Sequence, residues 1–146
     1  MLSIRSAFFV ALLLTLSCAA TQAPVRPWRV AVETSGGISG RGNGSASIDS
    51  EAKVAVTTIA RKECASTATE DELARFDQAL AAAKPEQWRE SYMPKDICCD
   101  RIESVLTVTI GEKTYTTKWL EVEALPRDVR AIAEALSAVR HAHDCK

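Results

Sequence analysis

The sequence has only two histidines, no cluster of Lys and Arg residues, and no long apolar run beyond its N-terminal segment. The histidines, His141 and His143, lie near the C-terminus, and no serine stands in the context of a hydrolase nucleophile. A formal net charge of −1 without a basic patch argues against nucleic acid or an anionic membrane as a partner. These absences predict a protein that is not an enzyme and needs no cofactor.

Residues 1–20 have the pattern of a secretory signal peptide, which is removed from the mature protein. Arg5 supplies the positive start, Ala7–Leu16 is a largely apolar stretch of ten residues, and small residues precede a cleavage site after Ala20. This stretch is half of the roughly 20 residues that a transmembrane helix needs, so no transmembrane segment is expected. We therefore expect the chain to be exported, to the periplasm or outside the cell.

Two alternatives remain open at this end of the chain. Ala23 offers a second cleavage site, although Pro24 follows it, and Cys18 raises the alternative of a bacterial lipoprotein that is cut just before a cysteine. The position three residues before Cys18 is Thr15 rather than the leucine that lipoproteins usually have. Residues 21–27 are expected to be a linker, and lipidation of Cys18 would anchor the domain to the membrane.

Four cysteines remain in the exported chain: Cys64, Cys98, Cys99 and Cys145. An even number of cysteines in an oxidising compartment predicts disulfides. Adjacent Cα atoms are about 3.8 Å apart, below the roughly 4.4–6.8 Å of a disulfide, so Cys98 and Cys99 should not pair with each other. One of these two is expected to bond to Cys64 and the other to Cys145, and the sequence leaves the assignment open.

Alternating polarity and short turn segments predict five β-strands. The expected strands are Trp28–Thr34, Ala46–Asp49, Lys53–Ala60, Ile102–Ile110 and Lys113–Leu120. The last two flank Gly111-Glu112, a tight turn typical of a β-hairpin, and Leu106 and Val108 share one face. Strands joined by such short connections pair in antiparallel.

Two amphipathic helices are expected. Thr69 and Glu72 form a capping box at the start of the first helix, whose apolar residues recur at helical spacing until Pro85 ends it. Acidic residues in this first turn suit the helix dipole. The second helix has Pro126 at its first position and carries an apolar stripe to near His143.

The resulting order, β-β-β-α-β-β-α, predicts a single α+β domain over residues 28–146. We expect an antiparallel sheet of about five strands with both helices on one face, stapled by disulfides. Arg61–Ala68 is interpreted as a polar connection that carries Cys64. Glu86–Ile97 is interpreted as a loop or a short turn of helix whose aromatic side chains pack on the core.

The Gly-rich segment Ser35–Ser45 contains five glycines. Its spacing matches no phosphate-binding motif and a strand follows it, so a mobile connection is the first interpretation and a recognition loop the second. At the C-terminus, His141, His143 and Cys145 are residue types that bind metals. Side chains two apart on a helix diverge, however, and disulfide formation competes for the cysteine, so we expect no metal site.

Three segments, taken in order, carry a likeness to a known family. They are Ser35–Arg41; Thr69–Leu73 with Leu80 behind it; and Asp100–Glu103 followed by Leu106–Val108, Tyr115 and Leu125-Pro126. By their order and spacing over residues 29–139, they resemble the emfourins, bacterial protein inhibitors of thermolysin-like metallopeptidases. The cytoplasmic emfourins lack this signal peptide and these cysteines, so the chain looks like an exported relative.

The resemblance implies a secreted or periplasmic inhibitor, whose rigid sheet presents loops to the cleft of a zinc metallopeptidase. Ser35–Gly44 and Glu86–Lys95 are the loops expected to contact the target. The expected contact residues are Gly36, Gly37, Ile38, Arg41, Trp88 and Tyr92, although core packing is the first interpretation of the two aromatic residues. The alternative function is a non-catalytic envelope or periplasmic interaction domain, which lipidation of Cys18 would favour.

Overall fold

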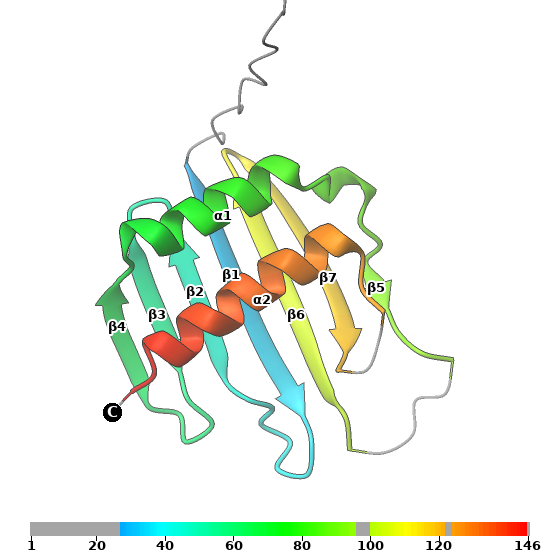
Figure 1. Ribbon diagram of the computed structural model, residues 1–146. Coiled ribbons are helices and arrows are strands. Elements are labelled where there is room, and N and C mark those ends of the chain that lie inside the picture. Colours follow the sequence, from blue (N-terminus) through cyan, green and yellow to red (C-terminus); the bar gives the residue numbers. More distant parts are fainter. Residues whose placement is uncertain (1–26, 96–99, 122–123, 146) are drawn as a thin grey trace, which may run out of the picture.

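The computed structural model describes residues 27–95, 100–121 and 124–145, which form an α+β domain. A seven-stranded sheet with the order β4-β3-β2-β1-β6-β7-β5 carries both α-helices on one face (Figure 1). The strands are β1 Trp28–Gly36, β2 Ser45–Asp49, β3 Lys53–Thr57, β4 Glu63–Thr67, β5 Ser91–Tyr92, β6 Ile102–Ile110 and β7 Lys113–Leu120. The helices are α1 Glu70–Ala82, the 3-10 helix η1 Pro85–Gln87 and α2 Arg127–Ala142.

The β6–β7 hairpin has the bounds and the register that its alternating sequence predicts. The strands pair in antiparallel from Glu103 opposite Leu120 to Ile110 opposite Lys113. Leu106 and Val108 are fully buried. A one-residue slip would turn both side chains to the other face of the sheet, so their burial specifies the register. Each such buried side chain contributes about 1.5–3 kcal/mol to the hydrophobic stabilisation.

Two of the strands are not predicted by the sequence pattern. β4 forms inside Arg61–Ala68, and β5 forms inside Glu86–Ile97. β5 pairs with β7 in parallel, so the sheet is mixed, and the prediction of about five antiparallel strands is wrong in count and order. Both strands lie at the edges of the sheet and are stabilised by their neighbours, and the mostly exposed side chains of β4 leave no apolar alternation to detect.

Both helices begin and end close to the predicted residues. The capping box is confirmed, because Glu72 N donates to Thr69 Oγ1 over 3.3 Å and Thr69 N donates to Glu72 Oε2 over 2.8 Å. α2 begins at Arg127, with Pro126 as the residue before its first turn rather than inside it. None of the helices in the described ranges is long and apolar enough to cross a membrane.

The core lies between the sheet and the helix layer. Its largest fully buried side chains are Phe76, Ile48, Leu106, Ile132, Leu136, Val30, Val54, Val108, Val129 and Val139. Trp28 at the start of β1 stacks on Phe76 of α1 with ring centroids 5.7 Å apart, and its Nε1 donates to Asp77 Oδ1 over 2.8 Å. Strand and helix are thus joined by apolar contact and by a satisfied indole donor.

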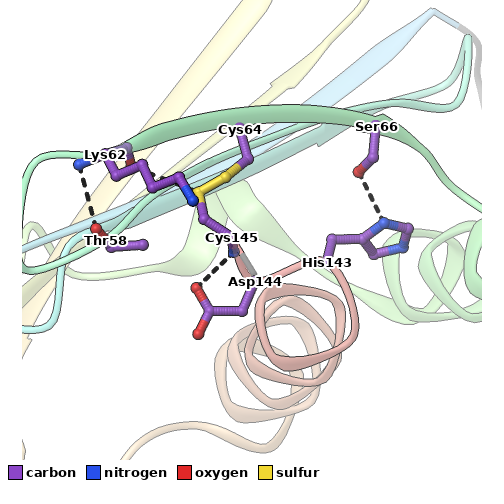
Figure 2. Close-up of a disulfide and its surroundings, with 7 residues drawn as sticks. All are labelled: Thr58, Lys62, Cys64, Ser66, His143, Asp144 and Cys145. Carbon is purple, nitrogen blue, oxygen red and sulfur yellow. Dashed lines mark hydrogen bonds between the residues drawn. A yellow bond between two sulfur atoms is a disulfide. The ribbon is translucent and has the colours of Figure 1, made fainter.

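A disulfide joins Cys64 of β4 to Cys145, just after α2, with the two Cα atoms 5.7 Å apart (Figure 2). The predicted pairings of these two cysteines with Cys98 and Cys99 are therefore wrong. Cys64 meets Cys145 because it lies on β4, a strand that the sequence pattern does not predict. β4 extends the sheet beyond β3 to the place where α2 ends (Figure 1). The disulfide therefore fixes α2 to the sheet edge instead of to the hairpin, and Cys98 and Cys99 lie outside the described residues.

Removing this disulfide is expected to destabilise the domain strongly. Its cysteines are 81 residues apart, for which the chain-entropy model gives about 4.5 kcal/mol. The double variant Cys64→Ala/Cys145→Ala should show this loss in urea unfolding. Peptide mapping without reductant checks the pairing directly, and a bond from Cys64 to Cys98 or Cys99 would contradict the structure.

Candidate functional site

The segment between β1 and β2, residues 37–44, is a hydrogen-bonded turn rather than an open connection. Backbone bonds join Gly36 N to Gly40 O, Gly40 N to Gly37 O, Gly42 N to Gly36 O and Thr34 N to Gly44 O, at 2.9–3.3 Å. The Thr34 hydroxyl adds two more, donating to Gly44 O over 2.7 Å and accepting from Asn43 N over 2.6 Å. These contacts give the loop one defined shape, as a recognition loop requires.

The predicted contact residues Gly36 and Gly37 lie at the base of this loop, against the start of β6. Gly37 N donates to Arg101 O over 3.1 Å, and a Cβ on Gly36 would lie 2.5 Å from Arg101 O. Arg41 pairs with Gly36 through an isolated β-bridge, and its side chain is exposed. Gly36 and Gly37 therefore determine the backbone shape of the loop, and the exposed side chains that follow them can contact a partner.

Ile38 occupies the tip of this loop with 95% of its surface exposed. In the part of the chain that the structure describes, the only other exposed large apolar residue is Ile59, at 50%, in the β3–β4 loop. Both loops leave the same end of the sheet (Figure 1), and a Cβ on Gly44 would lie 2.0 Å from Thr57 O. We call residues 37–44 and 58–62 together the loop end.

A groove of about 300 Å³ runs between the two loops. The residues that line it include Arg41, Arg61, Glu33, Glu63 and Ile59. The mixed charges and the open shape suit a polypeptide surface rather than an apolar small molecule, whose sites are lined mainly by hydrophobic side chains. The sequence pattern does not mark Ile59 or Arg61, because their place beside Arg41 depends on the pairing of β2 with β3.

Trp88 and Tyr92, the other predicted contact residues, lie elsewhere. Both are half-buried against the core, and β6 and β7 separate the β5 residue Tyr92 from β1. Trp88 Nε1 donates to Asp128 Oδ2 over 2.8 Å, and Lys84 N donates to the same oxygen over 3.2 Å. Burial of the Asp128 carboxyl opposes ionisation, but these donors outweigh it and hold its pKa below the ordinary value. The structure therefore does not bring the two aromatic residues to the loop end.

A second polar cluster forms where α2 ends. His143 Nδ1 lies 2.7 Å from Ser66 Oγ on β4, and His143 Nε2 lies 3.1 Å from Glu72 Oε1 on α1 (Figure 2 draws the first contact). Sequence reasoning misses this cluster because the residues are 77 and 71 positions apart. A serine, a histidine and a carboxylate in line are the components of a hydrolase triad.

The geometry assigns this cluster a structural role. In the hydrolase triad Nε2 faces the serine and Nδ1 faces the acid, whereas His143 has these contacts exchanged. Glu72 is also committed to the helix cap, since both the N–H and the hydroxyl of Thr69 donate to its Oε2. The cavity of about 280 Å³ that Glu72 lines is formed by α1 and α2 and does not include Ser66. The hydrogen bonds of His143 to Ser66 and Glu72 therefore connect the end of α2 to β4 and to α1.

The described residues contain no group of three or more His, Cys, Asp or Glu side chains that could hold a metal ion. Cys145 is bonded to Cys64, and His143 is hydrogen-bonded to Ser66 and Glu72. The chain matches no protein-family model and no curated protein sequence. The resemblance to the emfourins therefore stays a prediction from the residues quoted above.

Gly42 and Gly40 provide a matched test of the loop's shape. Both have positive φ, but a Cβ on buried Gly42 would lie 2.5 Å from Thr34 C, whereas a Cβ on Gly40 would meet nothing within 4 Å. Gly40→Ala should cost about 1 kcal/mol from backbone strain alone. Gly42→Ala should cost about 3 kcal/mol, because overpacking adds to the strain. Urea unfolding measures both, and equal losses would contradict the hydrogen-bonded shape.

The contacts of the Glu72 carboxylate predict that the domain loses stability in acid. Burial favours neutral Glu72, but the donors from Thr69 and the contact with His143 outweigh burial and hold its pKa below the ordinary 4.5. A carboxyl with a lowered folded-state pKa stabilises the fold above its ordinary pKa and loses that contribution as pH falls through the lowered value.

Glu72→Gln should therefore lower the free energy of unfolding by about 1 kcal/mol at neutral pH. The gap to the unmodified protein should close at a pH well below 4.5. Denaturant unfolding at both pH values measures this, with Glu134→Gln on the exposed side of α2 as the control. A gap that stays constant with pH would contradict the assignment.

Proposed function

We propose that this chain is an exported, non-catalytic inhibitor of a thermolysin-like metallopeptidase, and that it binds its target through the loop end. The observation that carries the proposal is Ile38, an apolar side chain that is 95% exposed at the tip of a hydrogen-bonded loop. With Ile59 of the neighbouring loop, Ile38 offers an apolar contact that the pocket of a partner would bury.

The binding energy would come from a small central anchor and a polar surround. Burying Ile38 completely contributes about 1.5–3 kcal/mol, and the partly exposed Ile59 adds a second apolar contact beside it. Arg41, Arg61, Glu33 and Glu63 all line the groove, which therefore offers charges of both signs to a partner.

The hydrogen-bonded shape of the β1–β2 loop favours an inhibitor, because few of its residues have to be ordered when it binds a target. The loop already makes its own hydrogen bonds, and it rests on β6 through the bond from Gly37 N to Arg101 O. A loop that is ordered before binding loses less conformational entropy in the complex, so more of the contact energy appears as affinity. The same features serve the alternative, a non-catalytic interaction domain of the envelope or periplasm.

Inhibition assays with the mature, disulfide-intact protein test the proposal. The protein is titrated against thermolysin and several related peptidases, and Ile38→Asp should weaken inhibition at least tenfold without changing the melting temperature. Glu112→Ala is the matched control, because Glu112 is exposed in the β6–β7 turn at the opposite end of the sheet (Figure 1) and should leave inhibition unchanged.

Two outcomes would contradict the proposal. Absence of inhibition at micromolar concentrations of native protein removes the peptidase as the target and leaves the interaction domain as the interpretation. Inhibition that Ile38→Asp does not weaken would show that the loop end is not the binding surface.

A further inference from the structure

β4 forms one edge of the sheet, and within the described ranges no strand pairs with its outer side. The strand pairs regularly with β3 over five residues, from Glu63 opposite Thr57 to Thr67 opposite Lys53. Its sequence, Glu-Cys-Ala-Ser-Thr, contains no proline and no lysine, the residues that commonly block an edge. The other edge differs, since β5 has only two residues and runs parallel to β7.

Two hydrogen bonds fix which backbone groups of β4 are used by β3. Thr58 N donates to Lys62 O over 2.9 Å at one end of the pair, and Ala68 N donates to Ala52 O over 2.8 Å at the other. Hydrogen-bonded pairs alternate with non-bonded pairs along an antiparallel ladder. The even-numbered residues of β4 therefore bond to β3, in register with these two ends.

The odd-numbered residues of β4, Glu63, Ala65 and Thr67, consequently direct their N–H and C=O groups to the open side of the sheet. All three are exposed. A row of three such residues can form a complete antiparallel ladder with one more strand. Neighbouring contacts already hold the strand in place, since Cys64 is bonded to Cys145 and Ser66 is hydrogen-bonded to His143.

We propose that a second copy of this chain occupies this edge, with its β4 antiparallel to β4 and the two-fold axis at Ala65. The register is self-complementary. Ala65 lies opposite Ala65 of the second copy, and Glu63 lies opposite Thr67 of the second copy. Glu63, the only charged residue of the strand, therefore does not face a second Glu63. The two sheets then form one continuous sheet.

Charge complementarity beyond the strand supports this occupant over an unrelated strand. In this register, the β3–β4 turn that carries Arg61 comes to lie next to the residues that follow β4 in the second copy, where α1 begins. The first turn of α1 is acidic, with Glu70, Asp71 and Glu72. The two-fold axis repeats this pairing of basic loop with acidic helix start, so it is formed twice in each dimer.

Sedimentation equilibrium of the mature, disulfide-intact protein tests the proposal without any peptidase, so its outcome is independent of the inhibition assays. We expect a concentration-dependent dimer. Ala65→Pro removes an N–H that β3 does not use and should abolish the dimer, while the circular dichroism of the monomer is retained. Ala65→Val keeps the N–H and is the matched control, which should still dimerise.

A charge exchange provides a second test that does not alter the strand. Arg61→Glu and Glu70→Arg should each weaken dimerisation at least tenfold, because each places like charges together twice. An equimolar mixture of the two variants should restore association, since every contact is then between opposite charges. A protein that stays monomeric at all concentrations overturns the proposal, and so does a dimer that survives Ala65→Pro or that the charge exchange leaves unchanged.

Discussion

The burial of the apolar stripe of α2 is the interaction on which the rest of this structure depends. Val129, Ile132, Leu136 and Val139 are at most 2% exposed, and they cover the sheet together with Phe76 of α1. At about 1.5–3 kcal/mol each, the four α2 side chains contribute roughly 6–12 kcal/mol, as much as the whole net stability of a typical domain. Without α2 the face of the sheet that carries Val30 and Leu106 would be open to water.

The course of α2 across the sheet also decides where the polar contacts form. The helix begins near β7 and ends beside β4 (Figure 1), so its last residues meet an edge strand that has little core of its own. His143 and Cys145 follow the apolar stripe directly and bond to Ser66 and Cys64 of that strand. Apolar packing thus positions the helix, and a hydrogen bond and a covalent bond then fix the edge.

The features that the sequence predicts are local ones. The β6–β7 hairpin and the capping box of α1 depend on residues within one turn or one pair of strands, so alternation and spacing are sufficient to find them. β4, β5, the Cys64–Cys145 bond and the neighbourhood of Ile59 depend on contacts between distant segments. The sequence excludes a bond between the adjacent Cys98 and Cys99, but it does not show which distant cysteines lie close together. Only the position of β4 at the sheet edge shows that Cys64 and Cys145 meet.

The order of the elements along the chain has a consequence for biosynthesis. α2, which supplies four buried core side chains, and Cys145, which closes the disulfide, both follow the seven described strands along the chain. A chain that lacks α2 leaves the apolar face of the sheet covered by α1 alone. The helix layer can therefore be completed only after α2 has been synthesised, and an apolar sheet face that is still uncovered favours aggregation.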